Sequence, residues 1–315
     1  MITKQDVTLA RANIQDQVKK TPLITARTLN ELLKNDMYIK GEHLQTTGSF
    51  KIRGATNKVT VIAKEGGRHV IAASSGNHGQ AVAYVAKELG LKATIVVPEN
   101  ATAAKVDAIK GYGANVIFCG FTSKDRIDRA KELAVETGAR YIPPYDDPLI
   151  MAGQGTVGLE ILEQAPDVDA IFVPVGGGGL ISGILTAIKE ENPSIKVIGV
   201  EPCAANDTKL SLEKGAPVTI DVPDTIADGL RSTSPGELTF PVLQKYLDDL
   251  ILVPEDDIKA ALRFLFQRMK QVVEPSGAVT LAAVMANPAP FENKKLVAVA
   301  SGGNVDLENL AALLA

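Results

Sequence analysis

The 315-residue sequence has few of the features that mark secreted, membrane-spanning or nucleic-acid-binding proteins. Its two cysteines, Cys119 and Cys203, are too few for a disulfide framework and lack the spacing of a zinc or redox site. No apolar run is long enough to cross a bilayer, and the charged first twenty residues lack the apolar centre of a signal peptide. The 33 Lys and Arg are scattered among 37 Asp and Glu, so no basic patch is present. We therefore expect a cytoplasmic protein without membrane or nucleic-acid partners.

Short apolar runs alternate with amphipathic segments in both halves of the chain. This order predicts an α/β fold with parallel sheets and helices on both faces, and near-continuous apolar strands fit such burial. No long linker separates the halves, which predicts two closely packed units with a cleft between them. The predicted strands are 68–74, 92–98, 114–120, 169–175, 195–201 and 294–300.

Three turns containing glycine follow predicted strands, where open α/β sheets bind ligands. Four consecutive glycines, 176–179, stand before a predicted helix, so bare amides and a helix dipole together predict a phosphate cradle. The spacing fails both the dinucleotide fingerprint and the Walker loop, which favours a small phosphate monoester over NAD or ATP. A tight structural turn is the alternative.

The other two turns are 74–79 and 301–304. The amides of residues 75–78 lie at a predicted helix start, where they could surround a carboxylate. The alternative is a strand-to-helix turn capped by Ser and Asn side chains. In the last turn, Ser301 ends a strand and Asn304 is predicted to cap the final helix.

Lys51 stands between Phe50 and Ile52, in a segment predicted to form a helix capped by Ser49. Lysine is almost never fully buried unless its charge is paired or removed. A lysine kept from water has a lowered pKa and becomes a nucleophile. A lysine, a small phosphate site and several polar donors fit pyridoxal phosphate, whose aldehyde would form an imine with Lys51 and so remove the charge.

The segments "GSFKIRGA", "SSGNHGQA", "AGQGT", "VPVGGGGL" and "SGGN", in this order, resemble the fold-type II pyridoxal-phosphate enzymes of the serine racemase and serine/threonine dehydratase family. The resemblance implies two open, mostly parallel twisted sheets with helices on both faces. It also implies a large cofactor-binding domain (1–68 and 146–315) and a small mobile domain (69–145) that closes over the substrate.

The resemblance assigns roles to individual residues. Lys51 would hold the cofactor, Phe50 would pack near its ring, Asn77 would bond a ring oxygen, and Ser301 would face the pyridine nitrogen. The phosphate loop would be Gly176, Gly177, Gly178, Gly179 and Leu180. The substrate carboxylate would meet Ser74, Ser75, Gly76, Asn77 and His78. Weaker resemblances place Glu274 and the backbone of Gly229 near the ring, whereas Arg126 is interpreted as part of a charged helix face.

In this family the freed lysine removes the Cα proton from one face of the substrate, and loss of a β-hydroxyl then gives a 2-oxo acid and ammonia. Racemisation needs an acid on the opposite face. Ser75 occupies the position where racemases carry that serine and many dehydratases carry alanine. The resemblance therefore implies a serine racemase with accompanying L-serine and L-threonine dehydratase activity. The alternative is a threonine/serine or 3-hydroxyaspartate dehydratase that does not racemise.

The resemblance also implies a divalent cation and a homodimer. Glu201, the carbonyl of Ala205 and Asp207 match the cation site of serine racemases, and hard oxygen ligands suit Mg²⁺, Ca²⁺ or Mn²⁺. A strand-end carboxylate and a helix-cap aspartate are the structural alternative. The rival from another functional class is a phosphate- or nucleotide-binding regulator that needs no reactive lysine.

Overall fold

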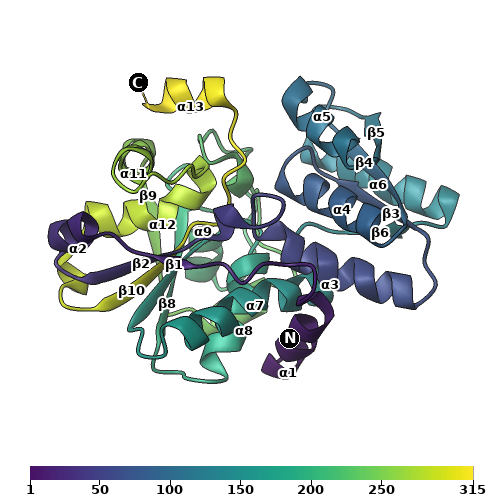
Figure 1. Ribbon diagram of the computed structural model, residues 1–315. Helices are drawn as coiled ribbons and strands as arrows, with labels where there is room; N and C mark the ends of the chain where they lie inside the picture. The colour runs from purple at the N-terminus through teal and green to yellow at the C-terminus, as the bar shows by residue number, and fades with distance from the viewer. Residues whose placement is uncertain (315) are drawn as a thin grey trace.

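A computed structural model describes residues 1–314 and contains two sheets with helices on their faces (Figure 1). The larger sheet has six strands in the order β1-β2-β10-β7-β8-β9, and the smaller has four in the order β5-β4-β3-β6. Every pairing is parallel except that of β1 with β2. The expected α/β fold is thereby confirmed.

The six predicted strands all form, each within two residues of its expected bounds. The larger sheet consists of β1 (Leu23–Ile24), β2 (Asp36–Lys40), β7 (Ala170–Pro174), β8 (Lys196–Pro202), β9 (Asp249–Val253) and β10 (Lys295–Val299). The smaller sheet consists of β3 (His69–Ala73), β4 (Lys92–Val97), β5 (Asn115–Phe118) and β6 (Arg140–Tyr141).

The apolar strands are buried on both faces, as their composition predicts. Along β7, Ile171 and Val173 join one apolar cluster, while the alternate residues Ala170 and Phe172 join the cluster on the other face. Both faces are therefore packed, and polar groups of the larger sheet collect at its strand ends.

Helices surround the two sheets in unequal numbers (Figure 1). Those of the larger sheet and its flanks are α1 (Lys4–Ile14), α2 (Arg27–Leu33), η1 (Glu42–Leu44), α3 (Lys51–Lys64), α7 (Pro148–Gln164), α8 (Gly179–Lys189), α9 (Asp207–Lys214), η2 (Asp228–Leu230), α10 (Phe240–Tyr246), α11 (Glu255–Gln267), α12 (Pro275–Ala286), η3 (Ala289–Phe291) and α13 (Leu307–Leu314). Those around the smaller sheet are α4 (Asn77–Glu88), α5 (Ala103–Gly111) and α6 (Ser123–Thr137).

Three helices, α3, α7 and α8, meet with their backbones almost in contact. A Cβ on Gly153 of α7 would lie 2.6 Å from the Cα of Gly54 in α3. On the same helix, a Cβ on Gly155 would lie 2.7 Å from the carbonyl oxygen of Gly183 in α8. Glycine is therefore required at both crossings, which lock the helix that begins with Lys51 to the helix that follows the four glycines.

Two predicted helix caps are wrong. The helix α3 begins after Phe50 and has no side-chain cap, because Ser49 pairs in extended form with Gly302 instead. Asn304 lies three residues before α13, too early for its N-cap position, and its side-chain amide donates to the carbonyl of Thr47 at 2.8 Å and to the side chain of Asn77 at 2.7 Å.

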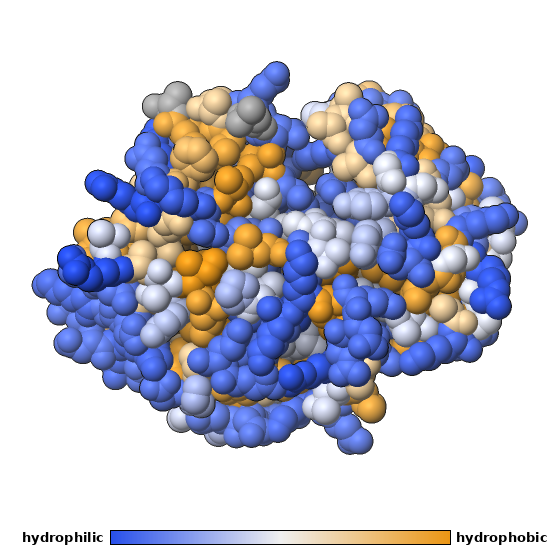
Figure 2. Space-filling view, in the orientation of Figure 1, coloured by the Kyte–Doolittle hydropathy of each residue, from blue (hydrophilic) through white to orange (hydrophobic). Residues whose placement is uncertain are grey.

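All strands of the smaller sheet lie within the predicted small domain, 69–145. Figure 2 shows a notch at the top of the molecule, between the part that carries α13 and the part that carries α5. The domain boundaries and the movement of this part stay predictions. Among residues 1–314, no helix combines the length and the apolar character needed to traverse a bilayer.

Candidate active site

Lys51 is the first residue of α3, so its amine projects from the start of a helix, as predicted. Its Nζ donates to the carbonyl of Pro144 at 2.7 Å and lies 5.1 Å from the centre of the Phe50 ring. Burial lowers the pKa of Lys51 to about 8, and the carboxyl of Glu274 acts in the opposite direction. The amine is therefore much closer to its neutral, nucleophilic form than an exposed lysine.

Pro144 connects Lys51 to the glycine turn, because the next residue, Tyr145, packs against that turn. A Cβ on Gly177 would come within 2.4 Å of the Tyr145 ring. Gly178 has φ +89°, a conformation that favours glycine. Within residues 1–314, the amides of residues 176–178 donate to no protein acceptor, although 177 and 178 are buried. Unpaired buried amides before a helix are suited to an anion.

Contacts on the other side of the turn lead back to the lysine. A Cβ on Gly176 would lie 3.4 Å from the carbonyl oxygen of Gly229, whose amide donates to Ser276 Oγ at 2.9 Å. Ser301 Oγ donates to the Ser276 carbonyl at 3.4 Å, and the Phe50 amide donates to the Ser301 carbonyl at 3.0 Å. The structure thus brings the predicted cofactor residues together in one closed series of contacts.

Asn77 joins this series from the smaller sheet. Its Nδ2 donates to Glu274 Oε1 at 2.7 Å, and its Oδ1 accepts from Asn304. Burial, reinforced by the nearby charge of Asp228, raises the pKa of Glu274 to about 8. The Glu274 carboxyl therefore holds its proton to a higher pH than an exposed glutamate. It lies beside Gly302, where a Cβ would come within 2.5 Å of its oxygen.

The turn after β3 holds the predicted substrate residues at the start of α4. Ser74 Oγ accepts from the Gly76 amide at 3.2 Å, so that amide is already paired. The amides of Ser75, Asn77 and His78 donate to no acceptor within the described residues, and neither does the half-buried Ser75 hydroxyl. The turn therefore offers three amides and one hydroxyl to a ligand.

The His78 side chain has a structural role at this turn. Its Nε2–H donates to the carbonyl of Ile142 at 2.9 Å. Burial, followed by the charge of Lys51, lowers the pKa of His78 to about 3. The ring is therefore neutral, its Nε2–H is already bonded to the backbone, and His78 lies in the first turn of α4 as expected.

The predicted cation residues lie at the carboxyl end of β8. Glu201 accepts from the amides of Thr208 and Lys209, each at 3.1 Å. In the part of the chain that the structure describes, both carboxylate oxygens of Asp207 are buried without a hydrogen-bond partner. Burial raises the pKa of Glu201 to about 8 and that of Asp207 to about 7.

Asp207 does not cap α9: it is the first residue of that helix, and the first-turn amides of Thr208 and Lys209 donate to Glu201 instead. Among the described residues, no group of three His, Cys, Asp or Glu side chains is placed to hold a metal. A cation there would need a backbone ligand, for which the buried Ala205 is adjacent.

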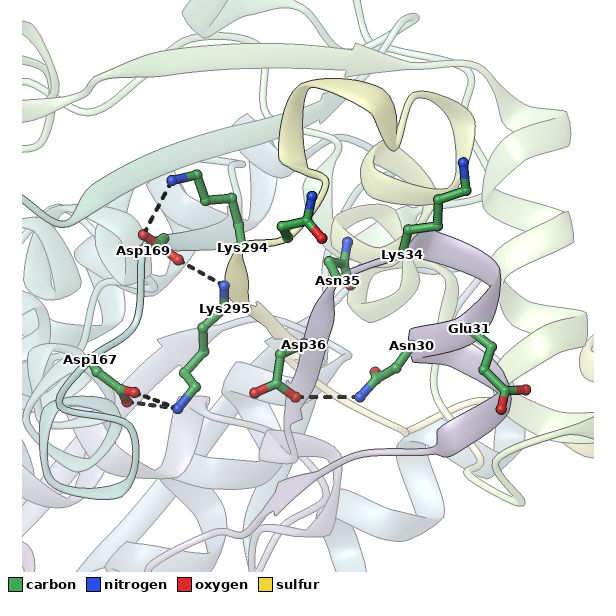
Figure 3. A pocket seen from close by; sticks show the side chains of 10 residues that line it. Asn30, Glu31, Lys34, Asn35, Asp36, Asp167, Asp169, Lys294 and Lys295 are labelled. Carbon is green, nitrogen blue, oxygen red and sulfur yellow. Dashed lines mark hydrogen bonds and ion pairs between the residues drawn. The ribbon is translucent and has the colours of Figure 1, made fainter.

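A separate hollow lies at the amino ends of β2 and β10, far from the glycine turns along the same strands (Figure 3). Its lysines are paired: Lys295 with Asp167 at 2.6 Å, and Lys294 with Asp169 at 3.7 Å. Because ligands of open α/β sheets bind at the carboxyl ends of strands, this hollow is not the candidate site.

Several residues of the site have no clear signal in the sequence. They are Pro144, Tyr145, Ser232 and Ser276; Ser232 ends the segment "ADGLRS" around Gly229, and Ser276 lies in "VVEPSGA" beside Glu274. Arg126 bonds only to Phe121 and Ser123 of its own segment, and no described hydrogen bond joins it to the site.

Comparisons with known proteins agree with this geometry. A family model described as "pyridoxal-phosphate dependent enzyme" matches residues 14–302. L-threo-3-hydroxyaspartate ammonia-lyase of Saccharomyces cerevisiae is 44% identical over 99% of this chain and 96% of its own length. Serine racemase of Dictyostelium discoideum is 44% identical over 99% and 98%. The structure of maize serine racemase superposes with a TM-score of 0.95, at 39% identity, covering 99% of this chain and 96% of that chain.

Proposed function

The chain belongs to the family of pyridoxal-phosphate dependent enzymes, and we propose that it racemises serine and also dehydrates L-serine and L-threonine to 2-oxo acids and ammonia. The observation that carries the proposal is the position of Lys51. Its amine, with a pKa lowered to about 8, lies within one series of contacts that includes unpaired glycine amides and Ser301.

Pyridoxal phosphate fits the residues of this series. The amides of residues 176–178 donate to no acceptor among the described residues and could receive the phosphate, and Leu180 and Phe50 share an apolar cluster. Ser301 Oγ makes only one long hydrogen bond, which leaves the hydroxyl available to the ring nitrogen. When bound, the cofactor withdraws electrons from the substrate Cα and makes its hydrogen acidic.

Two side chains would then move protons on opposite faces of the substrate. Lys51 is the proposed base for the L-isomer, because an amine with a lowered pKa is partly unprotonated at neutral pH. Ser75 is the proposed acid on the other face, since its hydroxyl has no partner among residues 1–314. Dehydration needs no acid at Ser75, so it accompanies racemisation.

The substrate carboxylate would bind the turn from Ser74 to His78. The free amides of Ser75, Asn77 and His78 at the start of α4 suit an anion. We propose that the part from 69 to 145 closes over the substrate. The ion pair of Lys105 with Asp228, at 2.9 Å, joins α5 of this part to η2 and would hold the closed arrangement.

We further propose that Glu201, the Ala205 carbonyl and Asp207 hold Mg²⁺, Ca²⁺ or Mn²⁺. Two buried carboxylate oxygens without partners are costly unless they bind a proton or a cation. A cation there would tie the end of β8 to the start of α9. The residues present therefore fit the ion, which has no part in proton transfer.

The second candidate is an ammonia-lyase that does not racemise and acts on threonine, serine or 3-hydroxyaspartate. The 44% identity to the L-threo-3-hydroxyaspartate ammonia-lyase supports this second candidate. Both candidates use Lys51, and they differ in the role of Ser75. We also propose a cytoplasmic homodimer, in keeping with the two free cysteines, and light scattering would test the dimer.

The deciding experiment incubates the cofactor-loaded protein separately with L-serine, L-threonine and 3-hydroxyaspartate, then measures D-isomer and 2-oxo acid together. The proposal predicts D-serine and pyruvate from L-serine. Pyruvate without D-serine would select the second candidate. Neither product from any of the three substrates would refute both.

A further inference from the structure

Four charged side chains form a buried cluster directly behind Lys51. Its members, here called the Arg53 cluster, are Lys40, Glu42, Arg53 and Glu160. The first three are 0% exposed and Glu160 is 6% exposed. Successive helix residues are about 100° apart, so Arg53 projects from α3 about 200° from Lys51 and holds the opposite side of that helix.

The guanidinium of Arg53 donates hydrogen bonds to two carboxylates at once. Its Nε and Nη2 donate to both oxygens of Glu42, each at 2.8 Å. Its Nη1 and Nη2 donate to both oxygens of Glu160, at 2.7 and 3.0 Å. A further bond from Nη1 reaches Thr156 Oγ1 at 3.1 Å. Such paired bonds fix the plane and direction of the side chain as well as its distance.

Lys40 completes the cluster and cancels its charge. Its Nζ donates to Glu160 at 2.6 Å, to the Thr21 carbonyl at 2.7 Å and to Gln164 at 2.9 Å. Two cations thus face two anions. Buried ion pairs are often no more stabilising than apolar residues of the same volume. Stability alone therefore does not explain why four charges stand here.

The cluster joins the helix that carries Lys51 to elements that pack against it and against the strand end before Ser301. Arg53 lies on α3, Glu160 on α7, and Glu42 on η1. The residue after Glu42 donates its amide to the Ala300 carbonyl at 3.0 Å, next to Ser301. The start of α3 has no side-chain cap, so the bonds of Arg53 to Glu42 and Glu160 are side-chain constraints on the rotation of its first turn.

We propose that Arg53 is a positioning residue that, through Glu42 and Glu160, sets the direction of the Lys51 amine and thereby the rate of proton transfer on that face of the substrate alone. The inference rests on the proposed function, in which Lys51 and Ser75 serve opposite faces. Ser75 lies at the turn between β3 and α4, outside the elements that the cluster joins. Disruption of the Arg53 cluster should therefore slow proton transfer on the Lys51 face of the substrate more than on the Ser75 face.

The test measures exchange of the Cα hydrogen of L-serine and of D-serine in D₂O by NMR, per cofactor-loaded site. Arg53→Lys keeps the charge and removes the paired bonds, whereas Glu160→Gln keeps Arg53 and removes one anion. For both variants, exchange from L-serine should fall at least about tenfold, since small misplacements of a reacting group carry large rate costs. The rate of exchange from D-serine should change by no more than about twofold, which corresponds to about 0.4 kcal/mol of activation free energy, because the variants leave Ser75 in place.

The matched control is Asp248→Asn. Asp248 pairs with Lys189 at 2.6 Å and Lys196 at 2.9 Å, has a side chain 16% exposed, and makes no described contact with α3. This variant should lower the melting temperature and change the exchange rates of L-serine and D-serine by the same factor. Thr156→Val removes one hydrogen bond to Arg53 and no charge, so it replaces Arg53→Lys in the exchange measurement if that variant fails to fold.

Equal loss of exchange from both isomers, or no loss from either, would overturn the inference. If the unaltered protein shows no exchange from D-serine, the proposed role of Ser75 has failed instead. The inference is then judged on pyruvate formation from L-serine. A fall in kcat of at least about tenfold with KM unchanged supports it, and an unchanged kcat refutes it.

Discussion

The ring of Tyr145 occupies the space that a side chain at Gly177 would need. A Cβ there would lie 2.4–2.5 Å from three carbon atoms of the ring. Real Cβ atoms do not approach carbon so closely, so either the glycine turn or the tyrosine must move. Because the residue before Tyr145 receives the hydrogen bond of Lys51, such a movement would disturb the lysine and the proposed phosphate loop together.

Gly177→Ala should therefore weaken cofactor binding. Overpacking of this kind costs about 1–3 kcal/mol, which corresponds to about a 5- to 150-fold loss of affinity. Titration of the protein with pyridoxal phosphate, followed by the visible absorbance of the bound cofactor, measures the loss. The control is Gly111→Ala at the end of α5, where a Cβ would meet nothing within 4 Å. Equal affinity in both variants would show that the turn does not hold the cofactor.

Ser75→Ala should separate the two activities. Removal of a positioned acid costs about 10²–10⁴-fold, so D-serine formation should fall by at least about 100-fold. Pyruvate formation from L-serine should persist, because dehydration uses Lys51 and not the hydroxyl of Ser75. Chiral chromatography and a pyruvate assay on the same sample measure both. Ser75→Thr, which restores a hydroxyl, should recover part of the D-serine, and D-serine surviving in Ser75→Ala would contradict the assignment.

Stability should depend on pH and on divalent cations through Asp207. The pKa of this carboxyl is raised from 3.8 to about 7 by burial. Between those pH values the folded protein holds a proton that the unfolded chain has lost, so stability falls as pH rises through the window. With a chelator, the melting temperature should drop between pH 5 and pH 7.

A bound cation should offset that loss, because it compensates the carboxylate charge. At 100 times its dissociation constant a ligand stabilises a protein by about 2.7 kcal/mol. Differential scanning fluorimetry with Mg²⁺, Ca²⁺ and Mn²⁺ would show a higher melting temperature at pH 7. In Asp207→Asn the cation effect should vanish and the pH slope should flatten. A cation response unchanged in that variant would place the ion elsewhere.

Glu274→Gln should flatten a second part of the dependence of stability on pH. Burial raises the pKa of Glu274 from 4.5 to about 8, so its contribution to stability falls as pH rises between these values. Glutamine keeps an acceptor for Asn77 Nδ2 and cannot lose a proton. The variant should match the original protein at pH 5 and exceed its melting temperature at pH 8.5. A variant that is less stable at both pH values would show that the carboxyl is ionised and paired.

The sequence predicts the strands and glycine turns well because their signals are local. Each predicted strand is a short apolar run, and each glycine turn follows one directly. The long helix α7 is not among the predicted elements, because it is buried almost all round and therefore has no polar face to set a helical period. Its start does carry a signal, since Asp147 caps it and Pro148 follows.

Other features depend on contacts that are distant along the chain. Asn77 meets Glu274 across 197 residues, and the resemblance places each near the cofactor without predicting the bond between them. Ser49 is expected to cap a helix from its residue type alone, but its backbone pairs with Gly302. Tyr145 has no periodic pattern around it, and only the fold reveals what it covers. Partners of this kind follow from topology, which a single sequence does not specify.

The glycine crossings at Gly54 with Gly153 and at Gly155 with Gly183 leave no compressible layer between α3, α7 and α8. Lys51 and the glycine turn are consequently held by one closely packed frame, made of α3, α7 and α8. The Ser74–His78 turn lies outside this frame, at the start of α4, where a change of conformation need not disturb the crossings. Altered substrate preference should therefore be sought in that turn and its surroundings, because changes inside the frame would damage the chemistry before they changed the choice of amino acid.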